Sequence, residues 1–588
     1  MKILRIGCVL GGFFSMVLSM PAQTFTAMHS FDQTDGANSQ ASLIQATNGN
    51  FYGTTSWAGG SGVNSCGTVF GITPTGKLTM VYSFPGYYAP DGCTSVAPLV
   101  QGTNGNFYGT TSRGGDAPWG GGGTVFEITP GGKLTTLHGF CLENVCPNEE
   151  GPRGGLVLGT DGNFYGTTSN NDIYGPMGGT VFKITPSGVL TTLYTFCSQV
   201  NCADGNGPYG GMVQGTDGNF YGTTILGGIG GGTVFKITPS GQLTTLYSFC
   251  QHIADYQCTD GNSPEAPLVQ GTDGNFYGTT TDGGPSNPYG YSYGTVFKIT
   301  PTGTLTTLHG FEGPDGSAPV AGLIQASDGN FYGTTSYGGA NNPGGGAGYN
   351  YGTAFQITPS GTLTTLYNFC SQIQDGTCLD GNSPAAALVE ATDGTLYGTT
   401  AAGGNGTVCY PDGSCPLVSA GTVFSLPLGL DPFVETQPTF GKVAAAVKIL
   451  GPKLTGATSV TFNGTAAVFK VVSSSEITAA VPTGASTGFV TVTTPSGTLT
   501  SNQQFRVTPK VTSFTPPGGP VGTSVTIAGV SLAQTRVVTF GGVQATVLVA
   551  NSDTQVTATV PTDAVTGKIT VTTLGGTATS AKSFKVTP

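Results

Sequence analysis

The sequence predicts an all-β protein in which a seven-bladed β-propeller is followed by two immunoglobulin-like β-sandwich domains. A phrase that ends in Phe-Tyr-Gly-Thr-Thr recurs about every 56 residues, and a second phrase that starts with Gly-Thr-Val-Phe recurs in step with it. A fixed period of this length lies close to the range of propeller repeats. No stretch shows a convincing helical period of apolar residues, which favours strands throughout.

The copies are out of phase at the two ends of the repeat region, which predicts a closed ring. The first two phrases each occur seven times, but a third phrase, Leu-Thr-Thr-Leu-Tyr-x-Phe, occurs only six times after the first Phe-Tyr-Gly. The missing copy is residues 25–31, at the other end of the chain. An open solenoid needs capping repeats instead, so we expect this N-terminal strand to complete the last repeat. The propeller is predicted over residues 23–430.

Each repeat is predicted to form four short strands. Its β-branched and aromatic residues alternate as they do in half-buried strands. Asp217-Gly218 is typical of a tight hairpin turn, and Pro239-Ser240-Gly241 is typical of a second turn. In the fourth repeat the predicted strands are residues 211–215, 219–224, 233–238 and 243–249.

Residues 1–22 have the pattern of a secretory signal peptide. Lys2 and Arg5 precede an apolar run over residues 6–20, and Pro21-Ala22 follows it. The run is short for a membrane span, although an uncleaved N-terminal anchor is the alternative. No other segment is expected to cross a membrane, so the mature chain is predicted to be secreted or held at the cell surface.

Twelve cysteines remain once Cys8 of the predicted signal peptide is set aside. An even number in an exported chain favours disulfides. Cys66 and Cys93 lie in connections that reach the same face of the predicted propeller and are expected to pair. Zinc is disfavoured because each remaining loop offers two sulfurs and almost no histidine. The other pairs suggested by spacing are Cys141–Cys146, Cys197–Cys202, Cys250–Cys258, Cys370–Cys378 and Cys409–Cys415.

Charge is sparse and unevenly divided. Charged residues make up 8% of the chain. Residues 23–430 hold 7 Lys or Arg against 25 Asp or Glu, whereas residues 431–588 hold 10 against 5. An acidic propeller disfavours nucleic acid and anionic membrane surfaces as partners.

The last quarter of the chain consists of two units, 431–509 and 510–588, that align with one another nearly throughout. Their short alternating strands favour small β-sandwiches. The second contains "GPVGTSVTIAG" (519–529) and "VPTDAVTGKITVTT" (560–573). On these motifs the pair resembles the IPT/TIG family of immunoglobulin-like domains. The resemblance implies spacer or adhesion modules without catalytic residues.

The repeat phrases themselves resemble a known family. The pattern "DGNFYGTT…GGTVFKITPSGxLTTLYSF" is similar to the GloVer tandem repeats of bacterial choice-of-anchor surface proteins. The resemblance covers all seven repeats and implies an exported surface or secreted protein, with no established activity. The chain departs from the pattern because it ends at Val586-Thr587-Pro588, with no hydrophobic tail, which leaves the anchoring route open.

No catalytic residue is predicted within the repeats. His29, His138 and His309 occupy the slot that holds Tyr in other repeats, as expected of residues that fill space. The Asp of the Asp-Gly-Asn turn interchanges with Asn, which tolerates the same backbone conformation. A second acidic turn is also interpreted as structural, with calcium as the alternative cofactor; no metal site is assigned. Its residues are Asp35, Asp91, Asp204, Asp260, Asp315 and Asp380, with the third repeat's equivalent near residues 149–151.

Function is expected where the repeats disagree. They disagree between strands two and three and between successive repeats, and both sets of loops reach one face. Aromatic side chains there can stack on sugar rings, and acidic groups can accept hydrogen bonds from hydroxyls. The alternative is that they are ordinary exposed loop aromatics. The candidate ligand-binding residues are Trp57, Trp119, Tyr289, Tyr291 and Tyr349.

Three functions fit these features. The favoured hypothesis is a non-enzymatic binding or adhesion protein whose loop face binds a glycan or a surface protein, with the sandwich pair as a stalk. The first alternative is a propeller lyase or hydrolase acting on an extracellular polysaccharide or a small molecule. Such an enzyme needs a base, and only Glu127 and Glu390 are acids unique to one repeat. The second alternative is a purely structural envelope or matrix protein.

Overall fold

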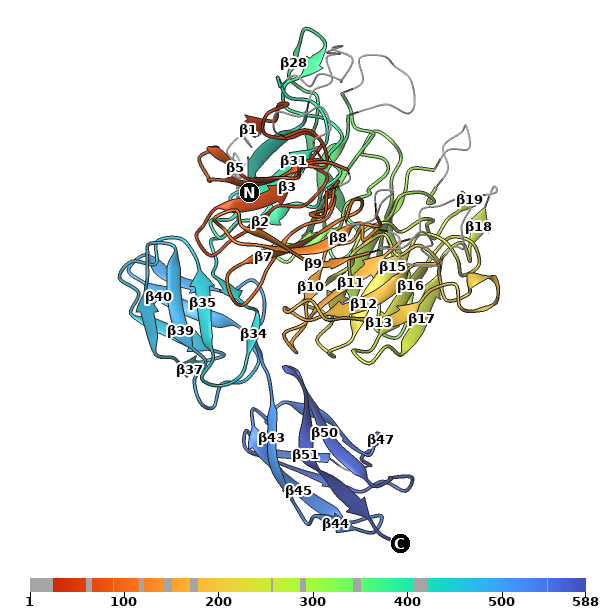
Figure 1. The fold of residues 1–588 in the computed structure, drawn as a ribbon, viewed down its shortest axis with the longest axis vertical. Coiled ribbons are helices and arrows are strands. Elements are labelled where there is room, and N and C mark those ends of the chain that lie inside the picture. Colours follow the sequence, from red (N-terminus) through yellow and green to blue (C-terminus); the bar gives the residue numbers. More distant parts are fainter. Residues whose placement is uncertain are drawn as a thin grey trace, which may run out of the picture.

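The structure is a computed structural model, and it is built of strands joined by turns and loops (Figure 1). The all-β class expected from the sequence is confirmed; the single helical element described is the short 3₁₀ turn Val200–Cys202. No helix in the described part of the chain is long and apolar enough to cross a membrane. The predicted signal peptide, residues 1–22, lies outside the described residues. The structure describes residues 25–59, 66–87, 89–115, 121–140, 151–169, 178–254, 257–285, 292–341, 351–406, 420–546 and 548–588.

The described residues up to Pro427 form seven antiparallel sheets of four strands, and in the first six the strands follow chain order. The first three are β2 (Ile44–Gln45), β3 (Phe51–Thr54), β4 (Thr68–Ile72) and β5 (Leu78–Ser83); β6 (Val100–Gln101), β7 (Phe107–Thr111), β8 (Thr124–Ile128) and β9 (Leu134–Gly139); and β10 (Val157–Leu158), β11 (Phe164–Thr168), β12 (Thr180–Ile184) and β13 (Leu190–Thr195). The next three are β14 (Val213–Gln214), β15 (Phe220–Thr224), β16 (Thr233–Ile237) and β17 (Leu243–Ser248); β20 (Val269–Gln270), β21 (Phe276–Thr280), β22 (Thr295–Ile299) and β23 (Leu305–Gly310); and β24 (Ile324–Gln325), β25 (Phe331–Thr335), β26 (Thr353–Ile357) and β27 (Leu363–Asn368).

The seventh sheet takes its outer strand from the N-terminus. It contains β30 (Val389–Glu390), β31 (Thr395–Thr400) and β32 (Thr422–Pro427), and β1 (Thr26–Ser30) pairs with β32. Thr26 lies opposite Ser425, and Ser30 lies opposite Thr422. This is the pairing that the displaced N-terminal copy predicts.

The first strand of each sheet is shorter than the sequence suggested. In the fourth repeat only Val213 and Gln214 join the ladder, instead of residues 211–215. The flanking glycines explain this, because Gly211 lies against the backbone of Gly155 in the preceding sheet, and a Cβ on Gly215 would lie 2.8 Å from Tyr221. Two small hairpins also extend the loops: β18 (Ile253–Ala254) with β19 (Gln257–Cys258), and β28 (Ile373–Gln374) with β29 (Thr377–Cys378).

Residues of the repeated Phe-Tyr-Gly-Thr-Thr motif make contacts between neighbouring sheets. The Tyr221 ring stacks on Phe276 of the next sheet with 3.9 Å between ring centroids. The glycine is required because the Phe of the third strand lies over it: a Cβ on Gly222 would lie 2.6 Å from the Phe235 ring. The equivalent ring contact joins the last sheet to the first, where the ring centroids of Phe51 and Tyr397 are 4.2 Å apart.

The first Thr of the phrase donates a hydrogen bond to a backbone carbonyl of the next sheet in all seven repeats. Thr223 Oγ1 donates to Ala266 O at 3.0 Å, and Thr399 Oγ1 of the last sheet donates to Ser39 O of the first at 3.3 Å. The contacts therefore run from each sheet to the next and from the seventh back to the first. The remaining donors are Thr54, Thr110, Thr167, Thr279 and Thr334.

A glutamine at the end of most first strands also links neighbouring sheets. Gln270 Oε1, for example, accepts from Thr216 N at 2.9 Å. Glu390 takes this place in the last sheet, and its carboxylate accepts from Ser327 N at 2.9 Å and from Ser327 Oγ at 2.6 Å. Burial raises the pKa of Glu390 to about 7, although the hydrogen bonds from Ser327 partly offset it.

The two C-terminal units have the same strand order. In the first, β33 (Glu435–Gln437), β35 (Ala446–Leu450), β39 (Glu476–Ala480) and β38 (Phe469–Val471) form one sheet; β37 (Thr465–Ala466), β36 (Ser459–Phe462), β40 (Val490–Thr494) and β41 (Gly497–Thr500) form the other; and β34 (Phe440–Gly441) pairs with β42 (Arg506–Val507). In the second, β43 (Lys510–Thr515), β45 (Ser524–Val530), β49 (Gln555–Thr559) and β48 (Leu548–Ser552) form one sheet, and β44 (Gly518–Gly519), β51 (Gly576–Val586), β50 (Gly567–Thr573), β46 (Thr535–Phe540) and β47 (Val543–Gln544) form the other. Each unit encloses one cluster of buried apolar side chains.

Candidate functional site

The seven sheets present two different faces. The turn face carries the tight turns between strands one and two and between strands three and four. The loop face carries the connections between strands two and three and those that lead from strand four to the next sheet. The first C-terminal unit docks on the turn face: Arg506 Nη2 donates to Gln214 O at 2.8 Å, Gln437 Nε2 donates to Gln45 O at 3.1 Å, and Phe433 N donates to Thr392 O at 3.0 Å.

The turn face also contains a hollow of about 350 Å³, between the first two sheets and the first C-terminal unit. Thr47 and Gln101 line it from the sheets, and Phe440 and Lys448 line it from the unit. Because the docked unit forms one wall, this cavity belongs to the contact between the two parts of the chain.

Aromatic–carboxylate pairs fix the loop face to the outer strands. Tyr247 OH donates to Asp260 Oδ2 at 2.7 Å, and His309 Nε2 lies 2.7 Å from Asp315 Oδ2. The interchange of Tyr and His is thus explained by a shared partner: the second acidic turn. Burial raises the pKa of Tyr247, and the hydrogen bond to Asp260 raises it further.

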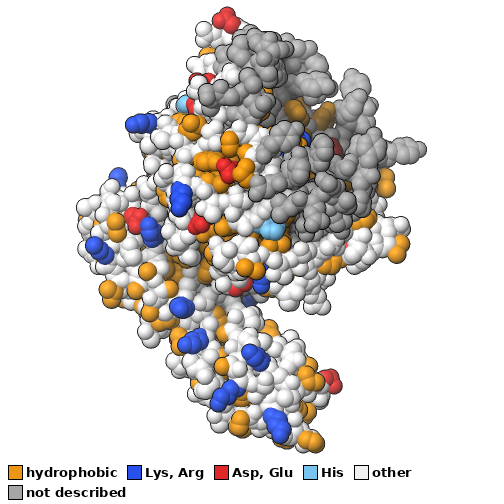
Figure 2. Space-filling model, viewed as in Figure 1, with side chains coloured by type: hydrophobic (Ala, Val, Ile, Leu, Met, Phe, Trp, Pro, Cys, Tyr) orange, Lys and Arg blue, Asp and Glu red, His pale blue; other side chains and the backbone are white. Residues whose placement is uncertain are grey.

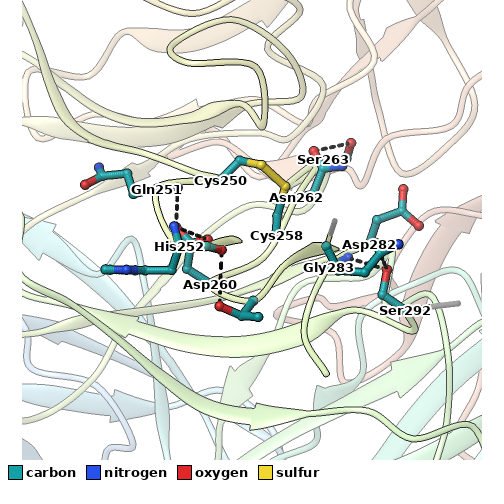
Figure 3. The surroundings of a disulfide bond; sticks show 12 residues. Cys250, Gln251, His252, Cys258, Asp260, Asn262, Ser263, Asp282, Gly283 and Ser292 are labelled. Carbon is teal, nitrogen blue, oxygen red and sulfur yellow. Dashed lines mark hydrogen bonds between the residues drawn. A yellow bond between two sulfur atoms is a disulfide. The ribbon is translucent and has the colours of Figure 1, made fainter. Parts of the chain in front are cut away.

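The carboxylates of the second acidic turn also accept backbone hydrogen bonds. Asp260 accepts from Gln251 N at 3.0 Å and from His252 N at 3.3 Å (Figure 3). Asp380 accepts in the same way from Ser371 N at 2.9 Å. Within the described ranges, no three His, Cys, Asp or Glu side chains come together as a metal site would require.

Among the described residues, four disulfides tie the loop face. Cys66–Cys93 links the β3–β4 connection to the connection after β5. Cys197–Cys202, Cys250–Cys258 and Cys370–Cys378 each close a short loop after a fourth strand. The last three are pairs suggested by spacing, and Cys66–Cys93 is the pair expected from the predicted propeller geometry. Cys141, Cys146, Cys409 and Cys415 lie outside the described residues.

One set of variable positions, which we term the bridge positions, follows the second strand. Each forms an isolated β-bridge with the loop that precedes its own sheet, as Asp282 does with Asn262 and Trp57 with Ala37. The backbone at this position is therefore fixed in the same way in each of these sheets, while the side chain differs from one repeat to the next. The described bridge positions are Trp57, Arg113, Leu226, Asp282, Tyr337 and Ala402.

A second variable set, the inner positions, lies just before each first strand. The residues on either side of each inner position are mostly buried, while the inner side chain is half-buried or exposed. Two neighbouring inner side chains contact each other: the Arg153 guanidinium lies over the Tyr209 ring, 4.9 Å from its centroid. The inner positions are Gln40, Val96, Arg153, Tyr209, Glu265, Val320 and Ala385.

Charged and aromatic groups gather where sheets three to five meet. Burial raises the pKa of Glu265, and the Asp282 carboxylate raises it further, while the Thr281 hydroxyl and Arg153 partly offset the shift. Partial burial likewise raises the pKa of Asp282. Burial also raises the pKa of Tyr209, with Arg153 and Glu265 acting in opposite directions. This cluster, Arg153, Tyr209, Glu265 and Asp282, can offer hydrogen-bond acceptors, a phenol and one cation to a polar ligand.

The structure places one of the five candidate residues predicted from the sequence. Trp57 is a half-buried bridge position that packs against the buried cluster around Phe31 and Ala37. Trp119, Tyr289, Tyr291 and Tyr349 lie outside the described residues, so their role stays a prediction.

The charged cluster was not among the predicted site residues. The sequence does indicate three of these positions when the repeats are aligned at the first strand. "GPRGGLV" (151–157), "GPYGGMV" (207–213) and "SPEAPLV" (263–269) keep their frame while the third letter changes. The five predicted candidates lie in aromatic loops, whereas each inner position is a single variable residue inside an otherwise constant motif.

Two family models match the chain. The Gloeobacter/Verrucomicrobia repeat matches residues 10–202 and 152–409, and the IPT/TIG domain matches residues 509–586. A search of curated proteins finds no match.

Solved structures show only distant similarity. A fungal alcohol oxidase in complex with copper is 11% identical, with a TM-score of 0.44, over 83% of this chain and 100% of that chain. A putative glucose dehydrogenase from Thermus thermophilus is 16% identical, with a TM-score of 0.31, over 56% of this chain and 95% of that chain. A surface glycan-binding protein from Prevotella bryantii is 20% identical, with a TM-score of 0.20, over 25% of this chain and 37% of that chain. Similarities at this level carry no argument about function.

Proposed function

We propose that the chain, which belongs to the Gloeobacter/Verrucomicrobia repeat family, is a non-enzymatic binding protein of the cell surface or its surroundings. Its loop face would bind a glycan, and its two C-terminal units would act as a stalk. The four disulfides support a place outside the cytosol, because disulfides persist in oxidising compartments.

The proposed architecture is a seven-bladed propeller over residues 23–430, closed by β1, followed by two β-sandwiches over residues 431–509 and 510–588. The cyclic run of Thr-to-carbonyl hydrogen bonds and Tyr–Phe contacts supports closure. The two facing sheets around one apolar cluster support each sandwich. In such a ring the inner positions surround the mouth of the central axis.

The observation that carries the proposed function is the separation of constant and variable residues. The residues that are constant among the repeats make the contacts between sheets, whereas the residues that vary lie at the inner and bridge positions of one face. The opposite face is partly covered by the chain's own C-terminal unit. A surface that is held rigid and varied in side chain is suited to recognition.

A glycan fits the chemistry of this face better than an apolar ligand. The bridge and inner positions combine Trp57, Tyr209 and Tyr337 with the polar groups of Arg153 and Glu265. Aromatic rings pack on sugar faces, and carboxylates and guanidinium groups hydrogen-bond to hydroxyls.

The test is a glycan array probed with the full-length chain, with and without calcium. We expect selective binding that falls when Trp57 or Tyr209 is replaced by Ala and persists for a variant on the turn face, Asp393→Asn. Recovery of the bound oligosaccharide at its original length supports binding without cleavage, whereas shortened products would indicate an enzyme. Absence of binding to every glycan in both conditions would contradict the proposal.

A further inference from the structure

We propose that the chain assembles head to tail, with three loops of one copy docked on the far end of the second C-terminal unit of another copy. The first surface, which we term the disulfide loops, consists of the segments closed by Cys197–Cys202, Cys250–Cys258 and Cys370–Cys378. The second surface, the tip, consists of residues 517–522, 560–568 and 583–588. Assembly goes beyond the proposed glycan binding, because these loops follow outer strands whereas the inner positions precede first strands.

The three disulfide loops each expose an aliphatic side chain at the same place. The third residue after the first cysteine is Val200, Ile253 or Ile373, and these residues are 84%, 66% and 51% exposed. Val and Ile are among the residues most often buried, although a single exposed one needs no explanation. Recurrence at one position in three loops indicates an apolar contact surface.

A buried carboxylate and a disulfide fix each of these loops. Asp260 accepts from Gln251 N and His252 N, the two residues before Ile253 (Figure 3). The aliphatic side chain is therefore presented on a backbone that is ordered in advance, which lowers the entropic cost of docking. The equivalent donors are Ser198 N and Gln199 N to Asp204, and Ser371 N and Gln372 N to Asp380.

The tip exposes two valines and two lysines. Val521 and Val565 are 46% and 55% exposed, and Lys568 and Lys585 are also exposed. The lysines lie on the paired strands β50 and β51, and Val521 follows β44, which pairs with β51 beside Lys585. Among the described residues, neither lysine forms an ion pair. The tip can therefore offer apolar contact and unpaired positive charge to an acidic partner.

The two surfaces have complementary charge. None of the disulfide loops contains Lys or Arg, and residues 23–430 as a whole hold 25 Asp or Glu against 7 Lys or Arg. The second C-terminal unit, residues 510–588, holds 5 Lys or Arg against 2 Asp. Opposite fields attract the loops to the tip, whereas two sets of loops repel each other. A second copy in head-to-tail orientation is therefore the occupant that the charges favour.

The shape of the molecule keeps the two surfaces of one copy apart. The β28–β29 hairpin, which carries Ile373, lies at one end of the long axis, and the tip lies at the other (Figure 1). A second copy must therefore supply the partner surface. Because each copy uses a different surface on each side, the contact is heterologous, and its repetition gives an open chain of copies unless the rotation closes a ring.

The test is sedimentation velocity of the full-length chain without any glycan, at about 0.05 M and about 0.5 M salt. We expect dimers and longer oligomers whose proportion rises with protein concentration. The association constant should fall at least about tenfold at the higher salt, because salt screens the attraction between the surfaces. Since no glycan is present, a failure of assembly would leave the proposed glycan binding standing.

Two variants each disable one surface. The loop variant replaces Val200, Ile253 and Ile373 by Ser, and the tip variant carries Lys568→Glu and Lys585→Glu. Each variant alone should associate at least about tenfold more weakly than the wild type. An equimolar mixture should nevertheless form a dimer and no longer oligomer, because the intact tip of the first fits the intact loops of the second. Unfolding midpoints would verify that both variants are folded.

Matched controls change exposed residues away from both surfaces. Val189→Ser alters a valine that is 62% exposed in a turn between strands three and four, and Lys442→Glu with Lys470→Glu reverses two exposed charges on the first C-terminal unit. Both controls should leave association within about twofold. A monomer under every condition, no effect of salt, a tip variant that assembles like the wild type, a mixture that stays monomeric, or equal losses in the controls would each overturn the inference.

Discussion

The turn face and the loop face are built from the same seven repeats, yet they differ in almost every property. On the turn face the Asp-Gly-Asn turn recurs with one hydrogen-bond pattern, in which Asp217 accepts from Asn219 N and from Tyr221 OH. On the loop face neighbouring copies place Tyr, Glu or Val at the same backbone position. Residues 23–430 hold 25 Asp or Glu against 7 Lys or Arg, whereas Figure 2 shows Lys and Arg side chains spread over the C-terminal units.

The difference shows which residues stabilise the packing of the seven sheets. The contacts between sheets come from the second strand and its turn: a Tyr–Phe stack, a Thr-to-carbonyl hydrogen bond and a Gln or Glu link. Because these contacts use none of the bridge or inner side chains, the side chains of the loop face can change without loss of these contacts between sheets. On the turn face, in contrast, the residues pack between sheets or contact the first C-terminal unit.

The largest expected effect is the loss of a constant aromatic residue. Tyr221→Ala removes a side chain that is 1% exposed, together with its stack on Phe276 and its hydrogen bond to Asp217. The free energy of unfolding should fall by about 4 kcal/mol. Tyr337→Ala, at a bridge position that is 45% exposed, should change it by less than about 0.5 kcal/mol. Urea unfolding compares the two variants, and equal losses would contradict the division between the faces.

The docked unit should be released from the turn face by Arg506→Met. The half-buried Arg506 side chain donates to the carbonyls of Gln214 and Gly215, and losing charged hydrogen bonds should weaken docking by about 3 kcal/mol. Small-angle scattering should report a larger radius of gyration. Lys585, the equivalent residue of the second unit, is exposed, so Lys585→Met should leave the radius unchanged. An unaltered radius for Arg506→Met would show that other contacts are sufficient.

Removal of one disulfide should loosen the loop face alone. The double substitution Cys250→Ser and Cys258→Ser removes a disulfide with a sequence separation of 8. Loop-closure entropy predicts that this disulfide contributes about 2.5 kcal/mol to the free energy of unfolding. Hydrogen exchange should accelerate at Asn262 and Asp282, whose backbones depend on this loop. Residues 271–275, the turn of the same sheet on the opposite face, should keep their rates. Acceleration of both segments together would show that the two faces are coupled.

Glu390 should make the turn face sensitive to pH. Its pKa in the folded protein is raised to about 7 by burial, above the value of about 4.3 expected for an unfolded chain. The folded state therefore binds the proton more tightly, and stability falls as pH rises from about 4.3 through 7. Glu390→Gln restores the residue of most other sheets and should be more stable than the wild type at pH 8, by on the order of 2 kcal/mol, with little difference at pH 4.

The matched control for this pH dependence is the reverse substitution in another sheet. Gln270 occupies the same place and accepts from Thr216 N. Gln270→Glu should therefore introduce a second fall in stability over the same pH range. Thermal unfolding of the three proteins across pH measures both effects. Parallel pH profiles for the wild type and Glu390→Gln would contradict the assignment.

Much of the fold was predictable because the repeats carry their own alignment. The four strands per repeat, the hairpin turns and the pairing of residues 26–30 with the last sheet follow from periodicity and from the displaced copy. The predicted propeller also identified the Cys66–Cys93 pair, because their two different connections were expected to reach the same face. The short first strands were missed because the flanking glycines act through tertiary contacts, such as that of Gly211 with Gly155 of the preceding sheet, which local patterning does not contain.

The site was less predictable for a physical reason. Arg153, Tyr209, Glu265 and Asp282 are far apart in sequence and come together only when successive sheets are placed side by side. Docking on the turn face was also hidden, since Arg506 and Lys585 hold equivalent positions in two aligned units and only Arg506 meets the repeats.

The most direct test of the central claim is hydrogen exchange of the full-length chain with and without the best glycan from the array. The claim that the variable face is the binding surface predicts protection of loop segments such as 263–266 and 281–284. It also predicts unchanged exchange in the turns 215–219 and 271–275. Protection confined to the turn face or to the C-terminal units, with the loop segments unchanged, would contradict it.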